Sequence, residues 1–284
     1  MSNINAATVK DLREITGVAM MDCKKALMET NGDLKAAQDY LRKKGQAKAL
    51  KKSSRETREG TIFFSRSSNG KSASMVKVAC ETDFVARNSK FKSFVKEIAE
   101  QICEKGTENL MKQQLLSGDG NIQSFLTNFI AELGENIQII DTKKVNIKQG
   151  EIGGYVHNNG KIGVIVPLET QNHCEDERLK TLAHDIALHI AAFPAEAVKA
   201  EKVPTEVLDK EKEIFMAQAR ESGKPKEIID KMIEGRIKKY LKEVCVETQP
   251  FVKNPQMSVG ELVKKTSEEL GVNIEFKTFI KFQF

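Results

Sequence analysis

The sequence has no tryptophan and only three tyrosines, six prolines and five cysteines in 284 residues. The five cysteines are an odd number, lie far apart and form no C-x-x-C pair, which argues against a disulfide framework and a zinc knuckle. No apolar run approaches the roughly 20 residues that a membrane span needs, and no apolar segment follows Met1. We therefore expect a cytoplasmic protein, neither secreted nor inserted in a membrane.

Motifs for covalent or metal chemistry are also missing. His184 and His189 are five residues apart, whereas two histidines that share a metal on a helix prefer a spacing of four. Gly70-Lys71-Ser72 resembles the end of a phosphate-binding loop, but Ser65 stands where that loop requires a glycine. No G-x-S-x-G motif occurs either. The sequence predicts no enzyme, no catalytic residue, no metal site and no cofactor.

The net charge of +5 is concentrated in one segment. Eight basic and two acidic residues between Arg42 and Glu59 give this segment a charge of +6, so the rest of the chain carries −1. A nucleic-acid-binding domain would be expected to show a basic face with aromatic side chains. We expect a solvated linker here and no specific nucleic acid. An RNA-associated binding protein that uses this linker is the alternative function.

The first 45 residues are predicted to form three short helices. Thr8 and Asp11 suggest a capping box, Gly17 a left-handed helix end, and Asp33 the start of the third helix. Apolar residues at helical spacing are expected to face inward: Val9, Leu12, Ile15, Met20, Cys23, Leu27, Leu34, Ala37 and Leu41. So short a segment buries only a small core, so residues 1–45 are interpreted as a recognition module, with residues 46–58 as a basic linker.

The rest of the chain contains an internal duplication. Gly60, Ile62 and Asn69-Gly70-Lys71 recur 90 residues later, and each copy is predicted to be a β-hairpin with an Asn-Gly turn. A helical stretch at 91–99 then aligns with 179–187, and 132–137 aligns with 269–274 before a final strand. The predicted fold is α+β, with a core N-terminal half at 59–146 and a core C-terminal half at 147–284.

The second copy holds about 49 extra residues between its helix and its last strand, as the spacing of these matches indicates. Two charged helical stretches occupy that place, joined by Gly223-Lys224-Pro225, which suits a helix end followed by a new helix start. We predict an antiparallel coiled-coil insertion at about 201–248. A self-packed arm is the simpler interpretation, and contact with a second copy or a partner is the alternative.

The first copy is two residues longer between its hairpin and its helix, in the stretch 81–88. Duplicated scaffolds usually diverge where they bind, because loops tolerate change and carry function. Phe84 in this stretch has two interpretations. It is either a core anchor next to a strand or an exposed aromatic wedge offered to a partner.

Long motifs throughout the chain closely resemble the elongation factor Ts family. They are TGVAMMDCKKAL from Thr16, NGD from Asn31, ETDFVARN from Glu81, GEN from Gly134, HDIALHIAAFP from His184, SGKPKEIIDKMIEGR from Ser222 and QPFV from Gln249. The resemblance implies a ubiquitin-associated-like N-terminal domain, a core of two related halves and a coiled-coil insertion. It also implies a translation elongation factor that binds elongation factor Tu and promotes release of GDP, so that GTP can rebind.

The resemblance also implies which residues contact elongation factor Tu. The set is Thr82, Asp83, Phe84 and Val85 near the magnesium and phosphate site, Leu12, Arg13, Met20 and Met21 in the N-terminal module, and Leu133 and His157 elsewhere. Leu133 stands where some relatives have isoleucine. Phe284 follows the last predicted strand directly, whereas some relatives add a helix with further contacts. A one-to-one complex, a homodimer and a 2:2 complex through the core or coiled coil all remain open.

Overall fold

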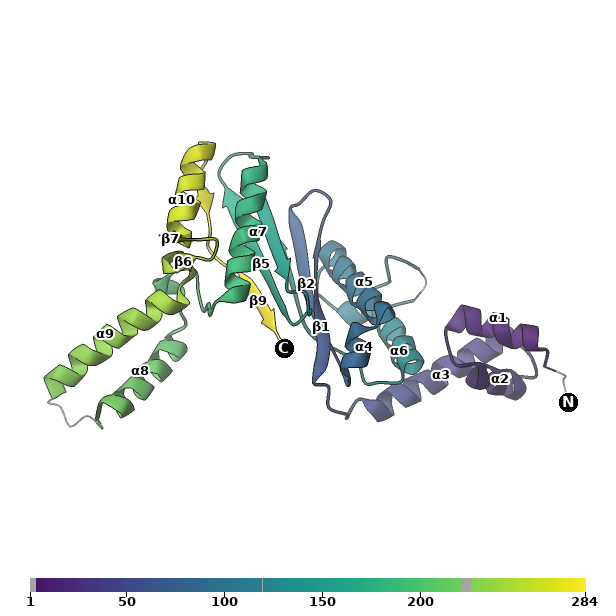
Figure 1. Ribbon diagram of the computed structural model, residues 1–284. Coiled ribbons are helices and arrows are strands. Elements are labelled where there is room, and N and C mark those ends of the chain that lie inside the picture. Colours follow the sequence, from purple (N-terminus) through teal and green to yellow (C-terminus); the bar gives the residue numbers. More distant parts are fainter. Residues whose placement is uncertain (1–3, 119, 221–225) are drawn as a thin grey trace. The chain divides into compact units, whose positions relative to one another are not determined.

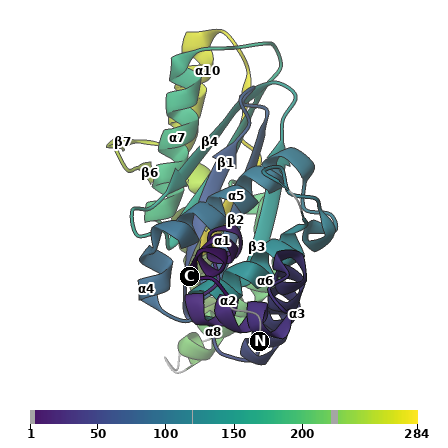
Figure 2. The ribbon, with the colours of Figure 1, turned by 90° about the vertical axis from the view of Figure 1, so that its right-hand side faces the viewer.

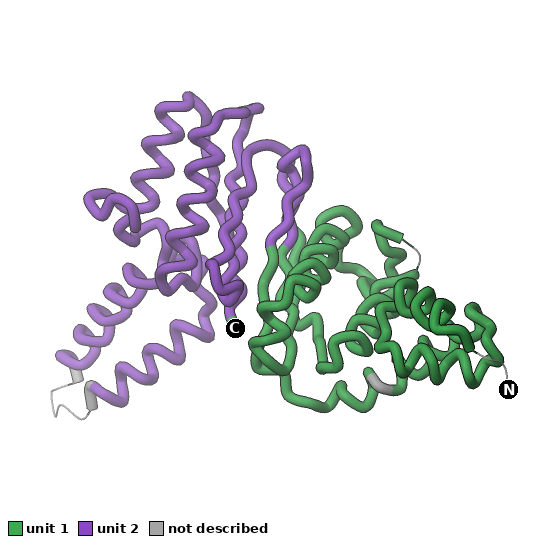
Figure 3. Tube along the Cα trace, turned by 45° about the vertical axis from the view of Figure 1, so that its right-hand side comes forward, with its two compact units in different colours: residues 1–63, 75–144, 284 green, residues 64–74, 145–283 purple. Residues whose placement is uncertain are grey.

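The computed structural model describes residues 4–118, 120–220 and 226–284, which form two compact units (Figure 3). Unit 1 comprises residues 1–63, 75–144 and 284, and unit 2 comprises residues 64–74 and 145–283. Each unit combines helices with strands of a β-sheet. The α+β class predicted from the sequence is therefore confirmed.

The N-terminal module of unit 1 consists of α1 (Ala6–Thr16), α2 (Met20–Glu29) and α3 (Leu34–Lys52) (Figure 2). These helices enclose a small apolar core of Val9, Leu12, Cys23, Ala26, Leu27, Ala37 and Leu41. Gly17 ends α1 with φ of 67°, and the Asp33 side chain caps α3 by accepting a hydrogen bond from the Ala36 N–H, as predicted.

Three local predictions for this module are wrong. Helix α1 begins before Thr8, because Asn5 is its cap and accepts a hydrogen bond from the Ala7 N–H at 3.1 Å. Three residues expected in the core are exposed: Ile15 at 61%, Met20 at 41% and Leu34 at 36%. Helix α3 continues to Lys52, so residues 46–52 of the expected linker are helical. Helical periodicity located the helices, but the cap residues set their ends.

The sheet of unit 1 has the order β1-β2-β3, from β1 (Glu59–Arg66), β2 (Ser72–Cys80) and β3 (Gln138–Asn146). Between β2 and β3 lie α4 (Asp83–Arg87), α5 (Ser89–Lys105), η1 (Leu110–Lys112) and α6 (Ile122–Leu133). The predicted apolar stripe of α5 is buried: Phe91, Phe94, Val95, Ile98 and Ile102. The Phe94 ring stacks on Phe129 of α6 with centroids 4.4 Å apart, which joins the two helices.

The sheet of unit 2 is built around β5 (Ile162–Thr170), which pairs antiparallel with β4 (Gly150–Val156), β8 (Ile274–Glu275) and β9 (Ile280–Gln283). Helix α7 (Glu177–Ala192) packs on β4 and β5. The remaining elements are η2 (Ala200–Lys202), η3 (Val246–Thr248), β6 (Pro250–Phe251), β7 (Asn254–Ser258) and α10 (Val259–Leu270). Residues Val164, Val166, Leu168, Leu182 and Ile186 lie in the core between the sheet and α7.

The sequence duplication is visible in the structure as glycines at equivalent positions of the two hairpins. Gly60 and Gly150 open the two hairpins with φ of 152° and 111°. A Cβ at these positions would lie 2.2 Å from the Val78 oxygen and 2.0 Å from the Leu168 oxygen of the neighbouring strand. Only glycine fits both the backbone angle and the close approach.

The insertion forms an arm of two helices, α8 (Thr205–Arg220) and α9 (Lys226–Val244), which pack side by side (Figure 1). Its base is closed by buried Ala197, Val203, Val244 and Cys245. Farther along the arm, the Arg236 guanidinium lies over the Phe215 ring, 5.6 Å from its centroid. The predicted turn at Gly223-Lys224-Pro225 lies outside the described residues.

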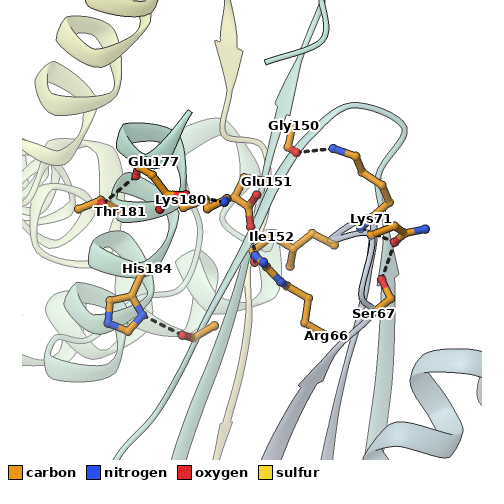
Figure 4. Close-up of polar contacts among 12 residues, drawn as sticks. Arg66, Ser67, Lys71, Gly150, Glu151, Ile152, Glu177, Lys180, Thr181 and His184 are labelled. Atoms are coloured by element: carbon orange, nitrogen blue, oxygen red, sulfur yellow. Dashed lines mark hydrogen bonds and ion pairs between the residues drawn. The ribbon is translucent and has the colours of Figure 1, made fainter. Parts of the chain in front are cut away.

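The tip of the first hairpin, residues 64–74, belongs to unit 2 and packs on β4 (Figure 4). Arg66 forms an ion pair with Glu151, which is only 8% exposed, and donates a hydrogen bond to the Ile152 oxygen at 3.3 Å. The Lys71 ammonium donates to the Gly150 oxygen at 2.9 Å. Because a buried carboxylate needs a cationic partner, Arg66 supplies what Glu151 requires inside this unit.

Candidate functional site

The stretch that the sequence singled out forms a short helix, α4, directly after β2. The Thr82 hydroxyl caps it by accepting a hydrogen bond from the Val85 N–H at 3.4 Å. Asp83 and Arg87 form an ion pair of 3.1 Å along its surface. Asn88 then caps α5 through the Lys90 N–H at 2.8 Å, so two caps define a separate turn of helix at the edge of the unit.

Phe84 is exposed on this helix. Its accessible fraction is 83%, the largest among the exposed large hydrophobic residues of the described chain. Ala86 is buried and Val85 packs against the apolar core of unit 1, so α4 turns its other face inward. The core interpretation of Phe84 is therefore wrong, because Ala86 and Val85 supply the inward face that Phe84 would have had to provide.

The loop before α4 is held by the carboxylate of Glu135, which follows the end of α6. One oxygen accepts hydrogen bonds from the N–H groups of Glu81 and Thr82, both at 3.1 Å, and the other accepts from the Thr82 hydroxyl at 2.6 Å. Bonds to an ionised acceptor are about twice as strong as neutral ones. The ETDF and GEN motifs, which are far apart in sequence, are therefore joined by hydrogen bonds in the structure.

A second set of contacts ties the same region to the end of the N-terminal module. Glu81 accepts a hydrogen bond from the Asn136 N–H at 2.6 Å and pairs with Arg55 at 3.4 Å. The Asn136 side chain is buried and donates to the backbone oxygens of Arg55 at 2.7 Å and Ser53 at 3.4 Å. Residues 53–55 of the expected linker are thus fixed to unit 1 in the structure.

The four predicted contact residues of the N-terminal module differ in exposure. Met20 is 41% exposed and Met21 is 73% exposed, and Arg13 is also on the surface. Leu12 is completely buried in the module's core. We therefore remove Leu12 from the contact set, because a side chain enclosed by its own domain offers no surface to a partner. Ile15 lies on the same helix and is 61% exposed.

The last two predicted contact residues lie in different units. Leu133 ends α6, is half-buried and packs against the apolar core of unit 1. His157 is exposed in unit 2, at the turn between β4 and β5, where its backbone oxygen accepts from the Gly160 N–H at 2.7 Å. The Tyr155 hydroxyl lies 3.1 Å from the His157 Nδ1.

The basic segment is engaged with its own chain. Cations of this segment have partners within unit 1: Arg42 with Ser124, Lys44 with Asp22, Lys52 with the Gly134 oxygen, Arg55 with Glu81, and Arg58 with Glu56. The hydrogen bond to Asp22 raises the pKa of Lys44. The carboxylates of Asp22, Glu81 and Glu56 offset part of the positive charge that would attract phosphates, which weakens the RNA-binding alternative.

The sequence reasoning missed the roles of Glu81, Glu135 and Asn136. GEN was recognised as a motif, but nothing in a single sequence indicates that its side chains reach a loop more than 50 residues earlier. Within the described ranges, no group of three or more His, Cys, Asp or Glu side chains could hold a metal ion. No helix in those ranges has the length and apolarity to cross a membrane.

Comparison with known proteins gives a consistent result. The family described as elongation factor TS matches residues 81–284. Elongation factor Ts of Clostridium novyi is 43% identical over 284 residues, covering 99% of this chain and 92% of that protein. That of Clostridium tetani is also 43% identical, covering 99% and 93%, and that of Lawsonia intracellularis is 42% identical, covering 99% and 98%. This chain belongs to the elongation factor Ts family.

Proposed function

We propose that this protein is a translation elongation factor that binds elongation factor Tu in its GDP form and accelerates GDP release. The observation that carries the proposal is Phe84, 83% exposed on a short helix that is anchored at both ends. A large exposed aromatic on a rigid support is typical of a binding hot spot. Family membership supplies the partner.

The proposed mechanism requires no covalent chemistry. Phe84 wedges into the GTPase, and Asp83 and the adjoining Thr82 and Val85 disturb the arrangement of Mg²⁺ and phosphate-binding groups. Mg²⁺ offsets the phosphate charge, so displacing its ligands weakens GDP binding. Linkage then requires that GTP rebinding weakens the complex, because a factor that lowers nucleotide affinity is itself bound less tightly when nucleotide is present.

We propose that further residues of each unit take part in the docking. Exposed Met20 and Met21, with Arg13 on the neighbouring helix, offer an adaptable apolar contact with a positive charge beside it. Leu133 and the exposed His157 turn are proposed to contact another part of the same partner. The Arg13, Met20, Met21 and His157 side chains are exposed, so each of these four is open to substitution.

The test is stopped-flow release of a fluorescent GDP analogue from elongation factor Tu, with wild-type protein and with Phe84→Ala. We expect strong acceleration by the wild type and a loss of at least about ten-fold in the variant, as for a hot-spot aromatic. Phe84 is exposed, so its removal leaves the core of unit 1 intact.

Leu116→Ala is the matched control, because Leu116 is a large apolar residue of unit 1 that is 50% exposed and lies outside every proposed contact. It should accelerate release like the wild type. No acceleration by folded wild-type protein would contradict the function. Equal acceleration by wild type and Phe84→Ala would support the proposed function but contradict the role of Phe84 as a wedge.

A further inference from the structure

Helix α4 has only five residues, from Asp83 to Arg87. A helix this short is not stable by itself, because forming the first turn fixes several dihedral angles for few hydrogen bonds. Its orientation therefore depends on what holds its ends. At the C-terminal end the chain continues into α5, whose buried Phe91 and Phe94 fix it in the core.

At the N-terminal end the fixing group is the Glu135 carboxylate. It accepts the N–H of Glu81, the N–H of Thr82 and the Thr82 hydroxyl, three donors on two consecutive residues. The same Thr82 hydroxyl caps α4 through the Val85 N–H. One carboxylate therefore sets the direction in which α4 leaves β2, and with it the direction of the Phe84 side chain.

Glu135 itself is held in place. It follows Gly134, whose φ of 80° ends α6, and precedes Asn136, whose side chain is buried and bonded to the backbone of Arg55. The Gly134 oxygen accepts a hydrogen bond from Lys52 at the end of α3. The acceptor is thus attached to a turn that α3 and α6 already fix.

We infer that Glu135 is a positioning residue for exchange, which acts by holding α4 in the orientation that presents Phe84. The effect of Glu135 on GDP release rests on the proposed function. Its effect on the ordering of α4 does not, because that ordering is a property of the free protein. Preorganisation of this kind strengthens binding by removing an ordering cost from the encounter.

Hydrogen exchange of the free protein tests the structural part. Glu135→Ala leaves the N–H groups of Glu81 and Thr82 without their acceptor, so exchange of amides in 81–87 should speed up at least about ten-fold, while amides of α5 and α6 keep their rates. Glu135→Gln should keep most of the wild-type protection, because the amide oxygen accepts both N–H groups and the amide nitrogen donates to the Thr82 hydroxyl, although these neutral bonds are weaker. Unchanged exchange in Glu135→Ala would overturn the inference.

The kinetic part uses GDP release from elongation factor Tu with a double-mutant cycle. Glu135→Ala should lower the efficiency of release at least about ten-fold, and Glu135→Gln should restore it. In a background where Asp83 and Phe84 are both alanine, the Glu135→Ala change should cost less than about two-fold, because α4 then has nothing left to present. An equal loss in both backgrounds would overturn the inference.

Glu132→Ala is the matched control for the turn. Glu132 lies three residues earlier and pairs with Lys90, and no contact joins its carboxylate to residues 81–82 in the described structure. Its removal should leave amide exchange in 81–87 unchanged. If wild-type protein fails to accelerate GDP release while Glu135→Ala speeds up exchange of the 81–87 amides, the proposed function fails and the ordering of α4 by Glu135 stands.

Discussion

At the scale of single residues, His189 is a buried polar group of unit 2 whose ring nitrogens both have hydrogen-bond partners. The His189 ring is fully buried, its Nδ1 accepts the Val252 N–H at 3.2 Å, and its Nε2 lies 2.8 Å from the Gln249 Oε1. The first bond leaves the proton on Nε2, so the neutral ring donates to Gln249. The Gln249 amide in turn donates to the oxygens of Pro194 and Glu243, which ties α7 to the base of the arm.

This environment predicts a pH dependence of stability. Burial lowers the pKa of His189 below its ordinary 6.5, so between the folded and unfolded pKa values the unfolded chain binds more protons. The contribution of His189 to the free energy of unfolding is therefore fully present above pH 6.5. It falls as the pH drops below 6.5, with a slope of up to about 1.4 kcal/mol per pH unit. Urea unfolding at pH 7.5 and 5.5 should show a smaller loss in His189→Gln than in wild type.

The exposed His173, which lies 3.6 Å from Glu175, provides the comparison. His173→Gln should keep the wild-type difference between the two pH values, because this side chain is exposed and packs in no core. If His189→Gln also shows the wild-type difference in stability between pH 7.5 and 5.5, the pH dependence comes from other groups and the assignment to His189 is incorrect.

At the scale of elements, the packing of α7 on β4 depends on a glycine. A Cβ at Gly153 would lie 2.2 Å from the Ala183 carbonyl carbon and 2.3 Å from its oxygen. On the same strand, a Cβ at Gly154 would meet the Phe64 ring at 2.4 Å. Adjacent residues of a strand face opposite sides of the sheet, so β4 is approached closely from both sides.

Gly153→Ala should therefore destabilise unit 2 by about 1 to 3 kcal/mol, the usual cost of overpacking, or more because the obstacle is backbone. Gly235→Ala is the matched control. A Cβ at Gly235 in α9 would meet nothing within 4 Å, so alanine should stabilise that helix by about 0.5 to 1 kcal/mol. Thermal unfolding should move the two midpoints in opposite directions, and a Gly153→Ala midpoint at or above wild type would contradict the close packing.

At the scale of the whole molecule, the arm is an addition to unit 2 rather than part of its core. Its two ends meet at the base, where the Glu196 N–H donates to the Val244 oxygen at 3.0 Å and the Val246 N–H donates to the Ala197 oxygen at 3.0 Å. Val203, Val244 and Cys245 close the base below the helices. The base therefore contains its own hydrogen bonds and apolar contacts.

Replacing residues 210–238 with a short Gly-Ser turn should leave the rest of unit 2 folded. The base cluster stays complete, and closing a short loop costs little entropy. Far-UV circular dichroism should show less helix, while unfolding stays cooperative and the midpoint falls by only a few degrees. Loss of cooperative unfolding would indicate that the distal arm stabilises the core.

Local patterns in the sequence determined much of this protein. The apolar stripe of α5, the glycine ends of α1, α6 and α10, the two Asn-Gly hairpins and the helical arm all follow from interactions within a few residues, which a sequence displays directly. The motifs also singled out the Phe84 stretch and the GEN turn. They indicated the family, and through it the proposed partner.

Only the tertiary structure decided which side chains face outward and which motifs meet. Spacing left the burial of Phe84 open, and the resemblance placed Leu12 in the contact set although its spacing placed it inward. The structure exposes Phe84 and buries Leu12, because burial depends on which neighbours fill the core. Glu135 reaches Glu81 and Thr82 across more than 50 residues, and Arg66 of the first hairpin pairs with Glu151 of the second. Contacts between segments distant in sequence leave no periodic pattern along the chain, so they are determined by the fold as a whole.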